Sequence, residues 1–95
     1  MKQPAVYILT SQRNGTLYIG VTSNLVKRIY EHKNHAVEGF SDQYDVTILV
    51  WFEIYDTMEA AISREKVLKR WNRSWKIELI EAKNSDWKDL YEEIL

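Results

Sequence analysis

An Asn-Gly pair between two β-rich runs is the feature that most constrains the fold. Residues 4–11 and 16–22 are rich in β-branched and aromatic side chains, and four polar or small residues separate them. Asn and Gly both accept the positive φ that a type I′ turn needs. The pattern therefore predicts a β-hairpin with Asn14 and Gly15 as its two turn residues.

The register of this hairpin determines which side chains share a face. A two-residue turn predicts these opposed pairs: Tyr18 with Ser11, Gly20 with Leu9, and Thr22 with Tyr7. Because directly opposed residues lie on one face, we expect Tyr7, Tyr18 and Gly20 on the same side of the sheet, with a hydrophobic face opposite. A glycine inside a strand often marks the close approach of a ligand or of another backbone. Aromatic pairs across a hairpin also commonly do nothing but pack, so both interpretations remain open.

The remaining apolar patterns predict one further strand and several helices. The expected elements are a helix from 24 to about 35, a strand over 46–55, and helices over 56–71, 75–80 and 87–94. Ser23 or Thr22 can cap the first helix, and Asp56 with Glu59 has the spacing of a capping box for the second. The third strand is apolar enough to be covered on both faces or to lie centrally. The predicted fold is α+β, a small three-stranded antiparallel sheet flanked by helices.

Length and composition limit the class of protein. A chain of 95 residues with 45% hydrophobic content fits one compact domain, so we expect residues 1–95 to form a single unit. The absence of cysteine excludes a disulfide framework and a thiolate metal cage, and it favours a reducing compartment. The N-terminus lacks the apolar run of a signal peptide, and no stretch is long enough for a membrane span. We therefore expect a soluble, cytoplasmic protein without membrane contacts.

Charge is distributed unevenly along the chain. The formal net charge is −1 and the isoelectric point is near 6.1, which argues against a protein that coats nucleic acid by bulk electrostatics. Residues 64–76 nevertheless carry six basic side chains against the single acidic Glu65, a formal charge of +5, and residues 78–95 carry −4. A basic band of this kind suits a local phosphate contact, although a solvated helix face is the more common explanation.

Glu65 is the residue that fits its expected surroundings least well. It lies on the apolar stripe of the helix predicted over 56–71, and burying an unpaired carboxylate is costly. We therefore expect a partner: an arginine, a set of hydrogen bonds or a metal ion, with Arg28 or Arg64 as candidates for a structural ion pair. Arg28 and His32, one helical turn apart, are by themselves more often a polar helix face. Neither histidine of the chain has zinc-ligand spacing.

Four segments form a specific combination: AVYIL at 5–9, LYIGVTSNLVKRIYEH at 17–32, AAISREKVLKRW at 60–71 and KIELIEAKNSDWKDL at 76–90. These segments contain a tyrosine, a gap of ten residues, Tyr-Ile-Gly, an arginine eight residues after that glycine, and a glutamate on a later helix. Together they are a far more specific signal than any one of them alone. The combination resembles the GIY-YIG nuclease superfamily, specifically its small single-domain bacterial members. The chain departs from the family pattern at Ala5-Val6 in place of Gly-Ile, at Val21 where a related DNA-repair incision domain has lysine, and at Ser85 in place of a frequent proline.

The resemblance implies a divalent-metal-dependent endonuclease whose site is shared by five matched side chains: Tyr7, Tyr18, Arg28, His32 and Glu65. Glu65 is implied as the ligand of one Mg²⁺ or Mn²⁺ ion, with substrate phosphate and water completing the octahedron. Arg28 would supply a second positive charge to the phosphate. The resemblance favours Tyr7 as the general base, whereas ordinary pKa values of about 10 for a phenol and about 6.5 for an imidazole favour His32. Both stay open.

Few substrate contacts can be expected from the sequence. The candidates are Gly20, Lys27, Lys33, Lys69, Arg70, Arg73 and Asn84. We expect weak, salt-sensitive and sequence-indifferent binding to nucleic acid, DNA rather than RNA, and the resemblance implies a role in DNA repair or recombination. Either a distorted or branched substrate is recognised by its shape, or a partner protein delivers it. The alternatives are a non-catalytic nucleic-acid-binding or protein-interaction module, and a scaffold in which Glu65 forms a structural ion pair.

Overall fold

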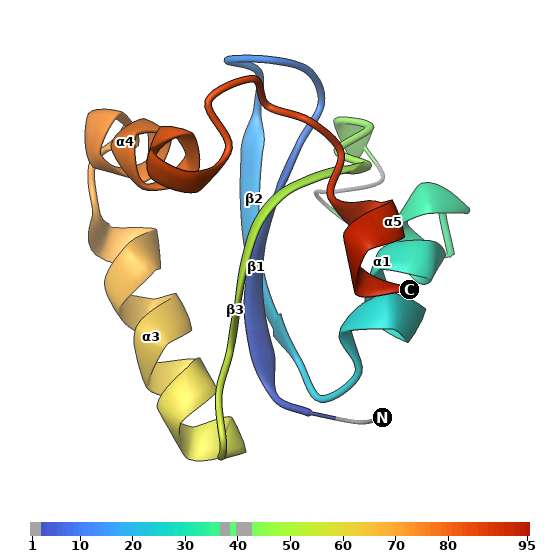
Figure 1. The fold of residues 1–95 in the computed structure, drawn as a ribbon, viewed down its shortest axis with the longest axis vertical. Coiled ribbons are helices and arrows are strands. Elements are labelled where there is room, and N and C mark those ends of the chain that lie inside the picture. The colour runs from blue at the N-terminus through green and yellow to red at the C-terminus, as the bar shows by residue number, and fades with distance from the viewer. Residues whose placement is uncertain (1–2, 37–38, 40–42) are drawn as a thin grey trace.

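A three-stranded antiparallel sheet lies at the centre of the protein, in a computed structural model that describes residues 3–36, 39 and 43–95. The strands are β1 (Ala5–Thr10), β2 (Leu17–Thr22) and β3 (Ile48–Ile54), in the order β2-β1-β3. The helices are α1 (Leu25–Lys33), α3 (Met58–Arg70), α4 (Arg73–Lys83) and α5 (Tyr91–Ile94). Helices α3 and α4 cover one face of the sheet, and α1 and α5 cover the other (Figure 1). The predicted α+β class is confirmed, and the third strand lies at an edge of the sheet, not at its centre.

The turn of the hairpin is longer than predicted. The backbone N–H of Ser11 donates to the Thr16 carbonyl at 3.3 Å, and the N–H of Gly15 donates to the Gln12 carbonyl at 2.8 Å, so the loop has four residues. Asn14 adopts a left-handed φ of 58°, whereas Gly15 does not have a positive φ. A type I′ turn needs a positive φ at both central residues, and the predicted two-residue turn is therefore wrong.

The longer loop shifts the register of the hairpin but preserves its faces. Tyr7 pairs with Gly20, and Leu9 pairs with Tyr18, so each partner differs by two positions from the expected one. Side chains alternate between the faces of a strand with a period of two. A shift of two therefore leaves Tyr7, Tyr18 and Gly20 on one face, as predicted, although the predicted opposed pairs are wrong.

The caps of helices α1 and α3 lie one or two residues after the predicted ones. The Asn24 side chain accepts a hydrogen bond from the Lys27 N–H at 3.3 Å and caps α1. The Thr57 hydroxyl accepts from the Ala60 N–H at 3.2 Å and caps α3, with Asp56 outside the helix. In each case the cap is the polar residue whose oxygen reaches the N–H three residues further on.

The C-terminal segment is less helical than its apolar pattern predicts. Helix α5 is a single turn, because Trp87 adopts a left-handed φ of 56° that an α-helix cannot continue through. The backbone instead runs along the outer edge of β3, where the Leu90 N–H donates to the Leu49 carbonyl at 2.7 Å. This segment covers part of the sheet edge that β3 would otherwise expose.

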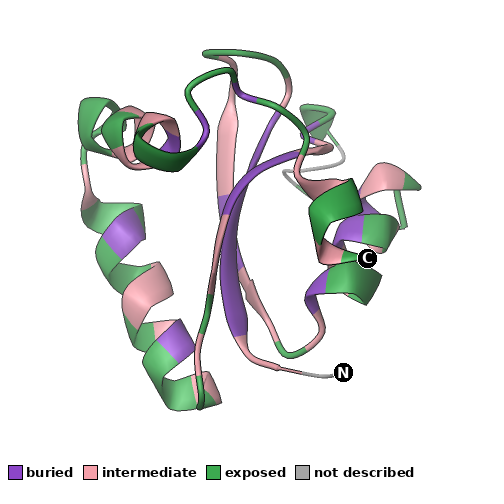
Figure 2. Ribbon diagram, viewed as in Figure 1, coloured by how far each residue is buried: buried purple, intermediate pink, exposed green. Residues whose placement is uncertain are grey.

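The sheet separates two hydrophobic clusters with different compositions. Toward α3 and α4 the cluster is built from aliphatic and tryptophan side chains such as Ile8, Leu68 and Ile80, each without exposed surface. Toward α1 and α5 the cluster includes Tyr7 and Ile29, with Tyr18 packed against it. Buried residues face the sheet from both sides, and the outer faces of the helices are exposed (Figure 2). Among the described residues, no helix is long and apolar enough to cross a membrane.

Candidate active site

Three aromatic rings from three elements meet on the α1 face of the sheet. Tyr7 lies on β1, Tyr18 on β2 and His32 in the last turn of α1. The ring centroids are 6.3 Å apart for the two tyrosines, 5.6 Å for Tyr7 and His32, and 5.4 Å for Tyr18 and His32. The structure therefore brings together three of the five predicted catalytic side chains in direct ring contact.

Gly20 makes this arrangement possible. It lies opposite Tyr7 across the hairpin, and a Cβ at this position would lie 2.4 Å from both Cζ and the hydroxyl oxygen of the Tyr7 ring. The group that approaches the bare glycine is thus the neighbouring phenol, in place of the ligand or second backbone that the sequence suggested. Any larger residue at position 20 would displace the ring.

A buried hydrogen bond joins the Tyr7 hydroxyl and His32 Nε2 at 2.9 Å. The exposed fractions are only 1% for Tyr7 and 3% for His32. Burial raises the pKa of the phenol, against the effect of the hydrogen-bonded Arg28 guanidinium. Burial, followed by the Arg28 charge, lowers the pKa of the imidazole to about 4. Both groups are therefore neutral at neutral pH.

Arg28 connects the buried rings to solvent. Its side chain is 37% exposed and forms an ion pair with Glu31 at 3.5 Å, so the predicted Arg28–Glu65 pair does not form. Together with Lys27, Glu31 and the backbone from Val21 to Asn24, it lines a predominantly polar hollow of about 270 Å³ at the start of α1. Sequence reasoning missed Glu31, although its position three residues after Arg28 on a helix was a usable signal.

Glu65 lies on α3, which covers the opposite face of the sheet (Figure 1). Its side chain is 15% exposed, and its partner is Lys69, one turn later on α3, at 3.4 Å. The expected partners Arg28 and Arg64 are wrong, because Arg64 pairs with Glu53 on β3 at 3.3 Å. The Glu65 charge is still close enough to Tyr7 to contribute, after burial and the neighbouring Tyr18, to the raised pKa of that phenol. The carboxylate and the rings therefore belong to one electrostatic environment.

The predicted cationic contacts differ in how freely they can meet a ligand. Lys33 donates to the Thr47 carbonyl at 2.9 Å and forms an ion pair with Asp89, so its charge is engaged within the fold. Arg73 donates to the carbonyls of Asn14 and Gly15, both at 2.7 Å, and ties α4 to the hairpin loop. Three others remain exposed on the helix surfaces: Lys27, Lys69 and Arg70.

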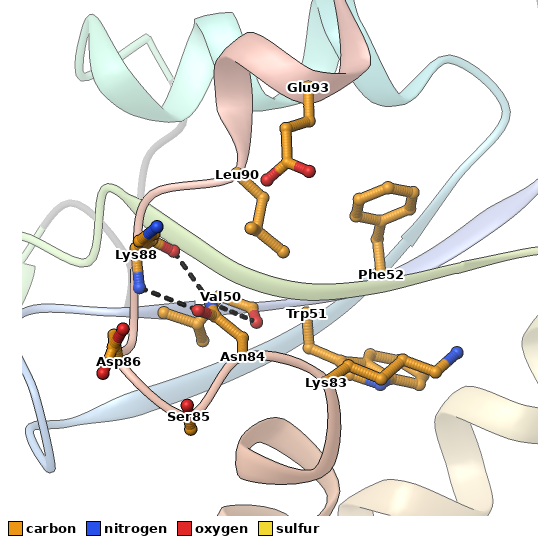
Figure 3. Close-up of a pocket in the computed structure, with 10 residues that line it drawn as sticks. All are labelled: Val50, Trp51, Phe52, Lys83, Asn84, Ser85, Asp86, Lys88, Leu90 and Glu93. Atoms are coloured by element: carbon orange, nitrogen blue, oxygen red, sulfur yellow. Dashed lines mark hydrogen bonds between the residues drawn. The ribbon is translucent and has the colours of Figure 1, made fainter.

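Asn84 is occupied by the backbone of its own chain. Its side-chain amide donates to the carbonyls of Val50 at 3.1 Å and Lys88 at 2.9 Å, and its oxygen accepts from the Lys88 N–H at 3.0 Å (Figure 3). It lies on a hollow of about 510 Å³ beside β3, which contains none of the tyrosines. Asn84 therefore holds the C-terminal segment against β3, and its side-chain amide is engaged by its own chain.

The donor set suits a metal ion only if the substrate contributes ligands. Among the described residues, no three histidine or acidic side chains are grouped as a protein-built metal site would require. Glu65 offers one carboxylate with limited exposure. Mg²⁺ keeps several water ligands and is commonly held by one or two carboxylates together with substrate phosphate. A single carboxylate such as that of Glu65 is compatible with an ion held in this way.

The sheet, the clustered tyrosines and the helix arginine define the class of the protein. Residues 3–78 match the family model of the GIY-YIG catalytic domain, and the chain belongs to this family. It is 37% identical over 79 residues to a UPF0213 protein of Clostridium perfringens, covering 83% of this chain and 84% of the relative. It is 34% identical over 76 residues to a UPF0213 protein of Haloquadratum walsbyi, covering 80% and 84%. The solution NMR structure of a UPF0213 protein from Bacillus halodurans has the same fold, with a TM-score of 0.57, 24% identity and 92% coverage of both chains.

Proposed function

We propose that this protein is a divalent-metal-dependent endonuclease that hydrolyses phosphodiester bonds in nucleic acid, with residues 1–95 acting as one GIY-YIG nuclease-like domain. The observation that carries this proposal is the ring cluster of Tyr7, Tyr18 and His32, with the Arg28 and Glu65 charges acting on the same buried phenol. A purely structural scaffold does not require a buried, neutral tyrosine–histidine pair beside an arginine. The altered pKa values of such groups are more typical of functional sites.

Each charged side chain has a separate task in the proposed reaction. Glu65 would hold a Mg²⁺ or Mn²⁺ ion, which would supply Lewis acidity to the phosphate. Arg28 donates hydrogen bonds to the phosphate from the polar hollow at the start of α1 and stabilises the negative charge that develops there. Water attacks phosphorus, the bond from phosphorus to the leaving oxygen breaks, the attacking water loses a proton to the protein, and solvent protonates the leaving oxygen.

The burial of the three rings indicates which of them accepts that proton. Tyr18 is half-buried, whereas Tyr7 and His32 are almost fully buried. This difference favours Tyr18 as the ring that meets the attacking water, with Tyr7 and His32 positioning it. Separate Tyr7→Phe, Tyr18→Phe and His32→Gln variants test this assignment, since only loss of the group that accepts the proton should change the pH profile of cleavage and not merely its rate.

The nature of the substrate follows from the small number of available cations. With Lys33, Lys69 and Arg73 engaged in the fold, Lys27 and Arg70 are the predicted contacts left for phosphates. Binding should therefore be weak, strongly salt-dependent and indifferent to sequence. We propose DNA in the cytoplasm as the substrate, in repair or recombination, with a partner protein or the shape of the substrate directing the enzyme.

Nicking of supercoiled plasmid in the presence of Mg²⁺ or Mn²⁺ tests the proposed hydrolysis. Glu65→Ala and Arg28→Ala should each reduce the rate by about 100- to 1000-fold, the range found when one electrostatic contact to a transition state is removed. Glu59→Ala on α3 and Arg13→Ala in the hairpin loop are matched controls at exposed positions, and both should retain the wild-type rate.

The outcomes separate an enzyme from a binding module. Equal nicking by the wild type and both site variants would indicate a contaminating nuclease. No nicking by any variant, with nucleic acid still bound, would favour the non-catalytic module. A melting temperature that falls in Glu65→Ala but does not respond to metal in the wild type would favour a structural ion pair with Lys69.

A further inference from the structure

The outer edge of β3 is covered along only part of its length. At its start, the Leu49 N–H donates to the Asp89 side chain at 3.3 Å, and the Leu49 carbonyl accepts from the Leu90 N–H at 2.7 Å. The Val50 carbonyl accepts from the Asn84 side-chain amide at 3.1 Å. Beyond Val50, no hydrogen bond from any described residue reaches the backbone on this edge. In Figure 1, no other element is drawn across this second half of β3.

The open part of this edge carries the backbone groups of Phe52 and Ile54. In an antiparallel pair, the N–H and C=O of one residue point to the same side, and the side alternates along the strand. The Tyr55 N–H donates to the Pro4 carbonyl at 2.8 Å, so Tyr55 points toward the β1 side. Phe52 and Ile54 lie an odd number of residues away, and their N–H and C=O groups therefore point outward. Such a row of unpaired donors and acceptors is a template for another strand.

A mainly apolar hollow adjoins these two residues on the face of the sheet that α1 and α5 cover. This smaller hollow has a volume of about 210 Å³, and its apolar lining consists of Leu25, Val26, Phe52, Ile54 and Ile94. Ile54 is 42% exposed and Val26 is 36% exposed, so part of the lining is in contact with water. Phe52 also lines the larger hollow of about 510 Å³ beside β3, so the two hollows meet at this edge. A strand added here would place alternate side chains over them.

Glu93 adds a negative charge where the two hollows meet, because it lines both of them. Its side chain extends from α5 toward β3, on the side of Leu90 and Phe52 (Figure 3). Its carboxylate has no ion-pair partner in the described part of the chain. The larger hollow also has two lysines and a second acidic residue, whereas Glu93 is the one charged residue described in the lining of the smaller hollow. A basic side chain would therefore complement the charge at this edge.

We propose that the edge formed by Phe52 and Ile54 binds an extended segment of a partner protein, which adds to the sheet as a fourth, antiparallel strand. An apolar side chain of the partner fills the smaller hollow, and a lysine or arginine two positions along the segment pairs with Glu93. In this mode of recognition, main-chain hydrogen bonds supply affinity and pockets for alternate side chains supply specificity. A second copy of this chain fits less well. A two-fold axis between two β3 edges would bring both Glu93 carboxylates to the same face of the joined sheet, where they repel each other.

Titration with a designed peptide tests this edge. The probe is an acetylated and amidated heptapeptide that has lysine at its centre, valine two positions to either side, and threonine elsewhere. NMR spectroscopy follows binding and amide hydrogen exchange. The N–H groups of Phe52 and Ile54 should exchange at least about fivefold more slowly when the probe is bound, because each gains a hydrogen bond. The N–H of Tyr55 is already bonded to Pro4, so its exchange should not change.

Two methylated forms of the probe separate main-chain pairing from side-chain contact. Methyl groups on the backbone nitrogens of the valines and the lysine remove the N–H groups that face β3, and binding should weaken at least about tenfold. The same number of methyl groups on threonine nitrogens removes N–H groups that face away from β3. That form should bind within about threefold of the unmethylated probe. Equal losses with the two forms would contradict the pairing of backbones.

Variants of the protein test the two side-chain contacts. Ile54→Ala should weaken binding by about three- to tenfold, because it removes apolar area from the smaller hollow. Val67→Ala, at a position 40% exposed on α3, is its control and should have no effect. Glu93→Lys should weaken binding by about three- to tenfold at low salt and by less at high salt. Its control is Glu92→Lys, because Glu92 lines neither hollow, and this change should alter affinity by less than about twofold.

A probe with glutamate at its centre and the sedimentation of the free protein complete the test. Glu93→Lys should bind the glutamate probe more tightly than the wild type does, and an equal preference of both proteins for the lysine probe would reject the charge pairing. A monomer that binds the lysine probe supports the proposal. A dimer that Ile54→Ala dissociates would place a second copy on this edge and overturn it. Unchanged Phe52 and Ile54 amides at about 1 mM probe would overturn it as well.

Discussion

The two faces of one hairpin differ in the side chains that they bury: one face is apolar and the other carries polar groups. Toward α3 and α4, β1 contributes Val6 and Ile8, which pack among apolar side chains. Toward α1, the same strand contributes Tyr7, which is hydrogen-bonded to a buried histidine and flanked by an arginine. Because side chains alternate along a strand, one face of β1 contributes to the apolar core, and the other face carries the polar groups of the candidate site.

The difference shows how a small domain keeps a polar site without losing its core. Aliphatic side chains on the α3 face stabilise the fold through the area they remove from water. On the α1 face, the polar groups are buried as a hydrogen-bonded set that remains neutral at physiological pH, which avoids the cost of an unpaired buried charge. Variants on the two faces should therefore affect different measurements.

The largest effect on stability is expected on the apolar face. Ile80→Ala removes a fully buried side chain of α4 that belongs to the apolar cluster. It should lower the free energy of unfolding by about 2–5 kcal/mol, as large-to-small core substitutions do. Below the melting transition, the nicking rate should stay close to wild type, since α4 carries none of the proposed catalytic groups. Denaturant unfolding and plasmid nicking check the two halves of this expectation, and a rate loss without unfolding would break the separation of the faces.

The polar face should make stability depend on pH in the acid range. The pKa of His32 is lowered by burial to about 4 in the folded protein, against about 6.5 in the unfolded chain. Between these values the unfolded state binds more protons, so this residue makes stability fall as pH drops from about 6.5 to about 4, by up to about 3 kcal/mol. His32→Gln should flatten this part of the stability curve. An unchanged slope in His32→Gln would contradict the burial of a neutral imidazole.

A smaller effect is expected where the two strands of the hairpin touch on the polar face. Gly20→Ala places a methyl group within reach of the Tyr7 ring and should cost about 1–3 kcal/mol of stability, as overpacking typically does. Nicking should fall as well, because the ring moves away from His32. In a Tyr7→Val background the same change should cost less. A double-mutant cycle followed by thermal unfolding measures the coupling, and additive effects would mean that the clash is relieved elsewhere.

Much of the fold was predictable because its signals are local. Alternation in the two first strands placed Tyr7 and Tyr18 on one face, even though the turn was misjudged, since a shift of two residues conserves the face. The caps of α1 and α3 were predicted to within one or two residues, because a capping side chain acts on N–H groups only three positions away. The start of α4 was two residues off, at Arg73 in place of Trp75. The C-terminal helix was overestimated, because its apolar pattern serves packing against β3 and not a regular helix.

The candidate site was predictable as a set of residue types but not as a set of contacts. The pattern of tyrosines, arginine and glutamate pointed to the family, and the family model matches residues 3–78. The partner of Glu65, the engagement of Lys33 by Asp89 and that of Arg73 by the hairpin loop could not be inferred. Ion pairs between distant positions depend on how helices dock, which no local period encodes.

Sequence alone determined the alternation of the strands, the caps of α1 and α3 to within one or two residues, and the presence of a tyrosine pair beside a strand glycine. Only the tertiary structure decided that Tyr7 lies over Gly20 and that His32 contacts both tyrosine rings. It also decided which lysines and arginines form contacts within the fold and which stay exposed. The physical reason is the distance along the chain over which each interaction acts. Backbone periodicity and capping act over a few residues, whereas burial and charge pairing depend on groups that meet only after the chain has folded.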